Sequence, residues 1–188
     1  MKRALKWALV LVGAGLLTLL LIGWQRDLDP ADLQAKYANG ASQFLDVGGG
    51  LLVHARDQGR GDGEAIVLLH GSNASLQTWE PWVKRLGTRY RVISLDQIGH
   101  GLTGPNPSDD YSPTAFVETL DRTLAKLGVT HFALAGSSMG GAVAWHYALA
   151  HPEKVDALIL VDAAGAPVAE STALPIGVRV AQTPLVRQ

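Results

Sequence analysis

The stretch FALAGSSMGGAVAWHYALAHP, residues 132–152, constrains the fold more than any other part of the sequence. An apolar run suited to a buried strand meets a glycine-containing turn, and an apolar helical segment follows at once. Ser138 has a glycine two residues away on each side, Gly136 and Gly140. Such glycines allow a tight, strained turn and a close approach of helix to strand. The pattern therefore predicts a serine hydroxyl held out over the end of a strand, at the start of a helix.

The same pattern predicts Ser138 as a nucleophile. The backbone N–H of Met139 lies at the predicted helix start, where unpaired amides favour negative charge. A second turn, HGSNAS, follows another apolar run and predicts a further N–H donor from Ser72 or from Asn73. Two convergent N–H groups form an oxyanion hole, in which each donor contributes about 3 kcal/mol. Ser137 lies one residue too early and is expected to end the strand.

Apolar runs and helical patterns alternate along the rest of the chain. Strands are expected at 42–47, 51–59, 65–70, 90–96, 131–136 and 155–162, and helices at 75–87, 112–128 and 139–152. This alternation predicts an α/β fold with a parallel sheet and helices on both faces. Ligands of such a sheet gather at the C-terminal ends of its strands.

Residues 1–25 predict a membrane anchor. Lys2, Arg3 and Lys6 precede an apolar stretch, 7–24. As a helix this stretch would span about 27 Å, close to the roughly 30 Å of a bilayer's hydrocarbon core. No small-x-small cleavage site follows, which favours an uncleaved signal anchor over a cleaved signal peptide. The basic flank predicts a cytoplasmic N-terminus and a catalytic domain outside the cytoplasm, in the periplasm or at the cell surface.

The composition excludes several classes of function. The formal net charge is −1, and no run of basic and aromatic residues supports nucleic-acid binding. The absence of cysteine excludes disulfides, thiol catalysis and thiolate metal sites. No metal or organic cofactor is expected. The expected partners are a small-molecule acyl substrate and the membrane.

The motifs HGSNAS, DQIGHGLT, GSSMGG and AHPEKVDALILVD follow one another in an order that resembles the α/β-hydrolase fold. The resemblance covers residues 44–166 and points to the branch of esterase-like and C–C-bond hydrolases. It implies a mixed, mainly parallel sheet, a Ser–acid–His triad and a cap inserted after the sixth strand. A serine at the elbow argues against the dehalogenases and epoxide hydrolases of this fold, which use a carboxylate there.

The resemblance implies that the acid and the histidine of the triad follow Ser138 in the chain. His146 and His151 do follow it, but they belong to the helix that Ser138 begins and cannot reach back to the hydroxyl. Asp162, at the end of the last predicted strand, is the candidate acid, and its alternative role is to cap the following turn. Structural or local roles, and no part in the triad, are expected for the other histidines and for one further aspartate: His54, His70, His100, His131 and Asp96.

The predicted domain order is a transmembrane signal anchor at 1–25, a linker at 26–43, an α/β-hydrolase core at 44–166 and the incomplete start of a cap at 167–188. In the linker, Asp29 and Pro30 predict the N-cap and first residue of a short helix. The strand-helix pattern stops after Asp162, so the chain is expected to be truncated after the sixth strand, at the start of the cap. The last strand is then expected to present an exposed apolar edge.

The sequence thus predicts the N-terminal portion of a membrane-anchored serine hydrolase. The parent enzyme is expected to cleave an ester-like acyl substrate through an acyl-enzyme on Ser138, with a catalytic histidine beyond residue 188. The 188-residue chain itself is expected to be inactive. Two alternatives stay open: a C–C-bond hydrolase with the same serine motif, distinguished by its cap residues, and a non-catalytic, membrane-tethered binding module.

Overall fold

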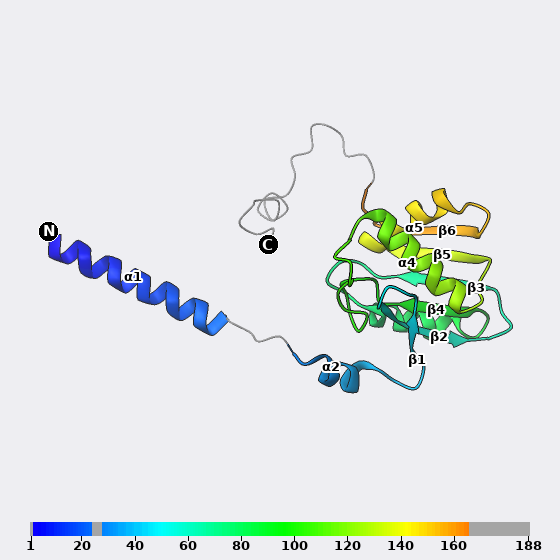
Figure 1. Ribbon diagram of the computed structural model, residues 1–188, viewed down its shortest axis with the longest axis horizontal. Helices are drawn as coiled ribbons and strands as arrows, with labels where there is room; N and C mark the ends of the chain where they lie inside the picture. The colour runs from blue at the N-terminus through cyan, green and yellow to red at the C-terminus, as the bar shows by residue number, and fades with distance from the viewer. Residues whose placement is uncertain (1, 24–27, 166–188) are drawn as a thin grey trace. The chain divides into compact units, whose positions relative to one another are not determined.

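The computed structural model of the protein describes residues 2–23 and 28–165 (Figure 1). The described residues form two compact units, one on either side of the boundary between Ala38 and Asn39. This boundary falls inside the linker predicted at 26–43.

The N-terminal unit holds two helices, α1 (Lys2–Gly23) and α2 (Pro30–Tyr37). Asp29 accepts the N–H of Ala31 at 2.8 Å, and Pro30 is the first residue of α2. Both details confirm the predicted start of the linker helix, since a carboxylate N-cap pairs a free N–H and proline needs no partner there.

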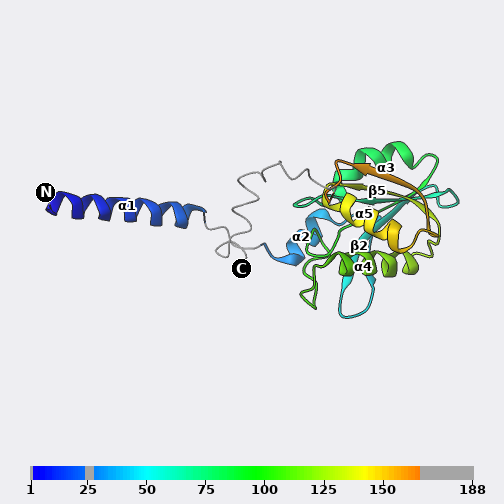
Figure 2. The ribbon, with the colours of Figure 1, turned by 90° about the horizontal axis from the view of Figure 1, so that it is seen from above.

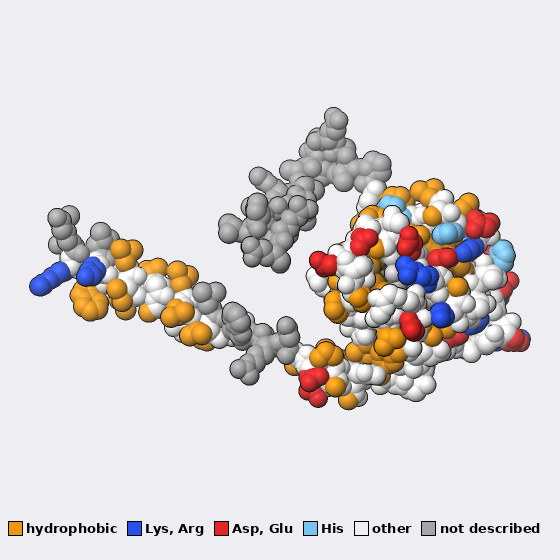
Figure 3. All heavy atoms as spheres, viewed as in Figure 1, with side chains coloured by type: hydrophobic (Ala, Val, Ile, Leu, Met, Phe, Trp, Pro, Cys, Tyr) orange, Lys and Arg blue, Asp and Glu red, His pale blue; other side chains and the backbone are white. Residues whose placement is uncertain are grey.

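Helix α1 coincides with most of the stretch predicted as an anchor. Its described apolar side chains, such as Trp7 and Leu11, are exposed. Arg3 and Lys6 belong to its first turns, and Figure 3 shows basic side chains near its N-terminal end. Within the described residues, no helix has the combination of length and apolar character that crossing a membrane requires. This finding does not support the membrane anchor predicted for residues 1–25.

The C-terminal unit is built on one sheet with the strand order β1-β2-β4-β3-β5-β6. The strands are β1 (Ser42–Asp46), β2 (Leu52–Gly59), β3 (Ala65–Leu69), β4 (Arg91–Leu95), β5 (Phe132–Ser137) and β6 (Val155–Val161). β1 and β2 pair antiparallel, β2 runs antiparallel to β4, and β4, β3, β5 and β6 are parallel. The predicted mixed, mainly parallel sheet is confirmed. The C-terminal ends of its four parallel strands lie along one edge.

Helices cover both faces of the sheet, as predicted (Figure 2). On one face, α4 (Pro113–Lys126) and α5 (Met139–Ala150) bury Leu120, Leu124 and Tyr147 against the strands. On the other face, the 3₁₀ helix η1 (Leu76–Trp79) and α3 (Glu80–Leu86) bury Trp79 against Ile66, Leu68 and Val92. The two apolar clusters hold the strand ends in place and thereby fix the loops that follow them.

The helix predicted at 75–87 is divided into η1 and α3. Pro81 has no N–H and cannot donate to the carbonyl four residues earlier, so a regular α-helix through this position would cost about 3 kcal/mol. In the structure Pro81 lies in the first turn of α3, where no intrahelical donor is required. The apolar period correctly predicts that the segment is helical, but Pro81 determines where the α-helix begins.

Strand β6 forms an edge of the sheet among the described strands. Its residues Leu158, Ile159 and Leu160 are 39–46% exposed. This confirms that the strand predicted at 155–162 presents an apolar edge to solvent. The cap predicted to start at 167–188 lies outside the described residues.

Candidate active site

Ser138 occupies a strained turn between β5 and α5. Its backbone φ is 49° and its ψ is −114°, a conformation that residues with a side chain rarely adopt. Such strain costs on the order of 1–3 kcal/mol and persists where the surroundings impose it. The residue is exposed, and its hydroxyl has no hydrogen-bond partner within the described residues. The geometry is that of the predicted nucleophile elbow.

The two flanking glycines are required by close packing of backbone on backbone. A Cβ atom at Gly136 would overlap the carbonyl of Gly140, and one at Gly140 would overlap the carbonyls of Leu69 and His70. Neither obstacle is a flexible side chain that could move aside. The spacing seen in the sequence therefore has a steric cause, since only glycine lets α5 start this close to β3 and β5.

Gly140→Ala is expected to lower the free energy of unfolding by at least 1–3 kcal/mol, roughly the cost of overpacking a rigid site. Gly61→Ala is the matched control, because Gly61 lies in an exposed turn with no atom within 4 Å of an added Cβ. Urea denaturation of both variants measures the difference. Equal stability of the two variants would contradict the steric explanation of the motif.

The turn after β6 is bound to the backbone of Ser138 on both sides. The N–H of Ser138 donates to Val161 O at 3.0 Å, and the N–H of Ala164 donates to Ser138 O at 2.9 Å. Asp162 lies between these two contacts, exposed, with a positive φ of 46°. Among the described residues its carboxylate has no hydrogen-bond partner, so the structure brings Asp162 close to Ser138 in the fold without joining the two side chains.

The predicted oxyanion-hole residues lie around Ser138. A Cβ at Gly71 would lie 3.3 Å from the Cβ of Ser138 and 3.9 Å from its Oγ, so the loop after β3 passes directly beside Ser138. Ser72 and Asn73 follow in this loop, both exposed, and Asn73 has a φ of 53°. Met139 is the first residue of α5, where the N–H has no intrahelical acceptor. Within the described residues the N–H of Ser72 has no acceptor either.

None of the six histidines is hydrogen-bonded to Ser138. His146 Nδ1 lies 2.8 Å from Ala142 O, and His100 Nδ1 lies 3.0 Å from Ile98 O, so both make local contacts as expected. His131 and His151 lie beside carboxylates at 3.7 and 3.8 Å. Nor do the described residues contain a cluster of three or more His, Cys, Asp or Glu side chains suited to a metal ion.

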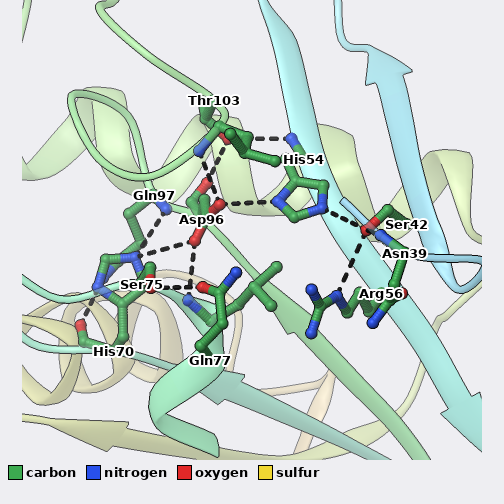
Figure 4. A network of polar contacts seen from close by, with 12 residues as sticks. Asn39, Ser42, His54, Arg56, His70, Ser75, Gln77, Asp96, Gln97 and Thr103 are labelled. Atoms are coloured by element: carbon green, nitrogen blue, oxygen red, sulfur yellow. Dashed lines mark hydrogen bonds and ion pairs between the residues drawn. The ribbon is translucent and has the colours of Figure 1, made fainter. Parts of the chain in front are cut away.

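The two remaining histidines belong to a buried polar network centred on Asp96, at the end of β4 (Figure 4). One carboxylate oxygen of Asp96 lies 2.7 Å from His54 Nδ1 and accepts the N–H of Leu102 at 2.9 Å. The other accepts the N–H of Leu76 at 2.8 Å. Asp96 thus ties β2 to the loops that follow β3 and β4, which confirms the expected role of this residue in ordering its loop.

Hydrogen bonding determines the charge of this carboxyl group. Burial by itself would raise the pKa of Asp96, but hydrogen bonds from the His54 ring and from the Leu76 and Leu102 amides outweigh it. The pKa of Asp96 therefore lies below its usual range. The network holds a buried, paired carboxylate at neutral pH.

The network also contains a Ser–His–Asp chain that sequence reasoning missed. Ser42 Oγ lies 2.8 Å from His54 Nε2, on the side of the ring opposite Asp96. The same oxygen accepts the N–H of Asn39 at 3.1 Å and that of Arg56 Nε at 3.4 Å. Ser42 Oγ is thus held by His54, Asn39 and Arg56 within the network, and we assign the chain a structural role. Antiparallel pairing of β1 with β2 creates this contact, and no local sequence signal marks it.

Comparison with known proteins is consistent with this geometry. Residues 64–184 match the family described as alpha/beta hydrolase fold. The chain is 34% identical over 139 residues to a cis-3-alkyl-4-alkyloxetan-2-one decarboxylase from Xanthomonas campestris, covering 70% of this chain and 46% of the relative.

Two solved structures are also similar. A membrane phospholipase A superposes with a TM-score of 0.69 at 29% identity, over 99% of this chain and 60% of that structure. A 2-hydroxy-6-oxo-6-phenylhexa-2,4-dienoate hydrolase from a Rhodococcus species gives a TM-score of 0.61 at 28% identity, over 68% of this chain and 47% of that structure. The chain spans less than half the length of the curated relatives it matches. With the elbow, the strand order and the family match in agreement, this chain belongs to the α/β-hydrolase fold family.

Proposed function

We propose that this chain carries the nucleophile and the oxyanion hole of a serine hydrolase that cleaves ester-like acyl substrates. The observation that carries the proposal is the conformation of Ser138, strained at φ 49°, exposed and with no hydrogen-bond partner for its hydroxyl among the described residues. A residue kept in such a conformation at a strand end, beside unpaired amides, is suited to attack on a carbonyl. Loss of ester hydrolysis on replacement of Ser138 tests the proposal.

In the proposed reaction Ser138 Oγ attacks the acyl carbonyl carbon, and the hydroxyl proton passes to a general base. The carbonyl oxygen becomes an oxyanion, which accepts hydrogen bonds from the N–H groups of Met139 and Ser72. Asn73 is the alternative second donor. The leaving alcohol takes the proton, and water then releases the acid from the acyl-enzyme. The proposal needs a base other than the six histidines, since each of them is engaged elsewhere.

Asp162 is the proposed acid partner of that base. The two hydrogen bonds that join its turn to the backbone of Ser138 keep the carboxylate near the nucleophile. Its exposure and its lack of a partner in the described residues leave it free to orient a histidine. An alternative is that Asp162 has a positive φ because it terminates β6 and turns the chain toward α5.

A C–C-bond hydrolase is the second candidate function. The similarity to the dienoate hydrolase favours it, at 28% identity over 68% of this chain. The similarity to the membrane phospholipase A covers 99% of the chain and favours an acyl ester instead. Both reactions use the same serine, so the two candidates are distinguished by comparing kcat/KM for a p-nitrophenyl ester with kcat/KM for a vinylogous 1,5-diketone. A higher value for the ester favours the esterase, and a higher value for the diketone favours the C–C-bond hydrolase.

The extracytoplasmic placement of the catalytic domain stays a prediction from the basic residues Lys2, Arg3 and Lys6. A reporter that is active only outside the cytoplasm, fused after Gln43, is expected to be active. Activity of a cytoplasm-specific reporter at the same position would show the opposite orientation.

A further inference from the structure

The ring of His70 is locked between two backbone groups beside the proposed oxyanion hole. Nδ1 lies 2.8 Å from Gly71 O, and Nε2 accepts the N–H of Gln97 at 3.1 Å (Figure 4). A carbonyl can only accept and an amide N–H can only donate, so the ring is neutral and carries its proton on Nδ1. Burial lowers the pKa of His70 and favours the same neutral form, against the opposing influence of Gly71 O and Asp96.

The carbonyl that His70 holds shares a peptide unit with a proposed oxyanion donor. Gly71 C=O and Ser72 N–H belong to one trans peptide, in which the two groups point in opposite directions. When His70 fixes the carbonyl on its own side, the N–H of Ser72 is directed away from the ring. Gly71 itself lies against Ser138. The His70 ring thereby sets the direction of the N–H beside the nucleophile.

Gln97 holds both the ring and the backbone of His70. Its backbone N–H fixes the tautomer, and its side-chain amide donates to His70 O at 2.7 Å. Gln97 is 3% exposed, and its Oε1 has no hydrogen-bond partner in the described structure. A buried acceptor without a partner destabilises a fold. Within the described residues, the hydrogen bond that the Gln97 side-chain amide makes is therefore the one to the backbone of His70.

We propose that His70 and Gln97 are positioning residues that aim the N–H of Ser72 at the oxyanion formed on attack by Ser138. This inference rests on the proposed function of Ser138. His70 fixes the Gly71–Ser72 peptide, and Gln97 fixes His70. Neither side chain touches the substrate, and both act through the direction of one N–H.

The test uses the full-length protein and hydrolysis of p-nitrophenyl butyrate. His70→Leu removes the donor to Gly71 O, and His70→Asn keeps a donor near the position of Nδ1. His70→Leu is expected to lower kcat about 10- to 100-fold with KM within about twofold, since losing one oxyanion donor outright costs about 10²- to 10³-fold. His70→Asn is expected to recover most of the loss. Gln97→Leu is expected to lower kcat about tenfold with KM within about twofold, and also to lower Tm, because the buried carbonyl of His70 loses its donor.

The inhibition constant of a trifluoromethyl ketone, which forms a tetrahedral adduct on the serine, is the second measurement. A purely structural role of His70 and Gln97 would leave this constant unchanged. Its inhibition constant is expected to rise by the same factor as kcat falls in each variant. The proposal is overturned if His70→Asn is no better than His70→Leu, or if Gln97→Leu keeps wild-type kcat and inhibitor affinity. Wild-type hydrolysis by Ser138→Ala in the same assay would instead overturn the proposed function. If Ser138→Ala is inactive and Gln97→Leu is fully active, the positioning role is wrong and the proposed function of Ser138 still holds.

Discussion

Ser138→Ala in the full-length protein is expected to lower kcat for ester hydrolysis by about four to six orders of magnitude, to the level that binding and the oxyanion hole alone support. The reason is that acyl transfer through an acyl-enzyme has no substitute for its nucleophile. KM is expected to change little, because the substrate contacts remain. Steady-state kinetics with p-nitrophenyl butyrate measure both constants.

Ser137→Ala is the matched control for this variant. Ser137 is the last residue of β5 and pairs in register with Val161. It therefore belongs to the strand and comes before the strained turn. The control is expected to keep kcat within a few-fold of wild type. Comparable losses in both variants, or a larger loss in Ser137→Ala, would contradict the assignment of Ser138 as the nucleophile.

Asp96→Ala is expected to lower the free energy of unfolding by about 3–5 kcal/mol, the range for removing one partner from a buried charged network. Asp96 is fully buried, and its loss leaves the N–H groups of Leu76 and Leu102 and the ring of His54 without acceptors. Asp156→Ala is the control, because the side chain of Asp156 is 63% exposed and its Oδ1 lies 3.7 Å from His131 Nδ1. Urea denaturation at pH 7 is expected to show a change within about 0.5 kcal/mol for the control.

The stabilisation from Asp96 is also expected to depend on pH in a defined direction. The folded-state pKa of Asp96 is lowered. Its contribution is therefore fully present above the unfolded-state value of about 3.9 and is lost as pH falls through the folded value. The stability difference between wild type and Asp96→Asn should shrink as pH falls below about pH 4. A difference that grows as pH falls would contradict the direction of the pKa shift.

The elbow could be predicted from the sequence because it is a local feature with a steric cause. Gly136, Ser138 and Gly140 lie within five residues, and backbone overlap at either glycine excludes a side chain. The parallel strands could also be predicted, since each is a continuous apolar run next to a helical pattern. In both cases neighbouring residues contain the information.

The polar network could not be predicted, because its members come together only through strand pairing and loop packing. Ser42, His54 and Asp96 are far apart in the sequence and lie on three different strands or strand ends. The division of the helix at 75–87 was missed for a different reason. The apolar period runs through Pro81 without a break, whereas the missing N–H of this residue decides where an α-helix can start.

The position of the candidate acid, Asp162, was predicted from the sequence. The sequence places Asp162 at the end of a strand, and the structure adds the two hydrogen bonds that keep its turn beside Ser138. Within the described residues, no histidine is hydrogen-bonded to either of these side chains. Asp162 is therefore proposed as the acid because the reaction requires a carboxylate partner for the base, and because its turn lies beside Ser138.

The most direct measurement of the central claim is the site at which a fluorophosphonate reacts. The full-length protein is treated with the probe, and the adduct is located by intact-mass and peptide mass spectrometry. We predict one adduct per chain, on the peptide that contains Ser138, and its complete loss in Ser138→Ala with retention in Ser137→Ala. An adduct on another serine, such as Ser42 or Ser72, or labelling that persists in Ser138→Ala, would contradict the assignment of Ser138 as the nucleophile.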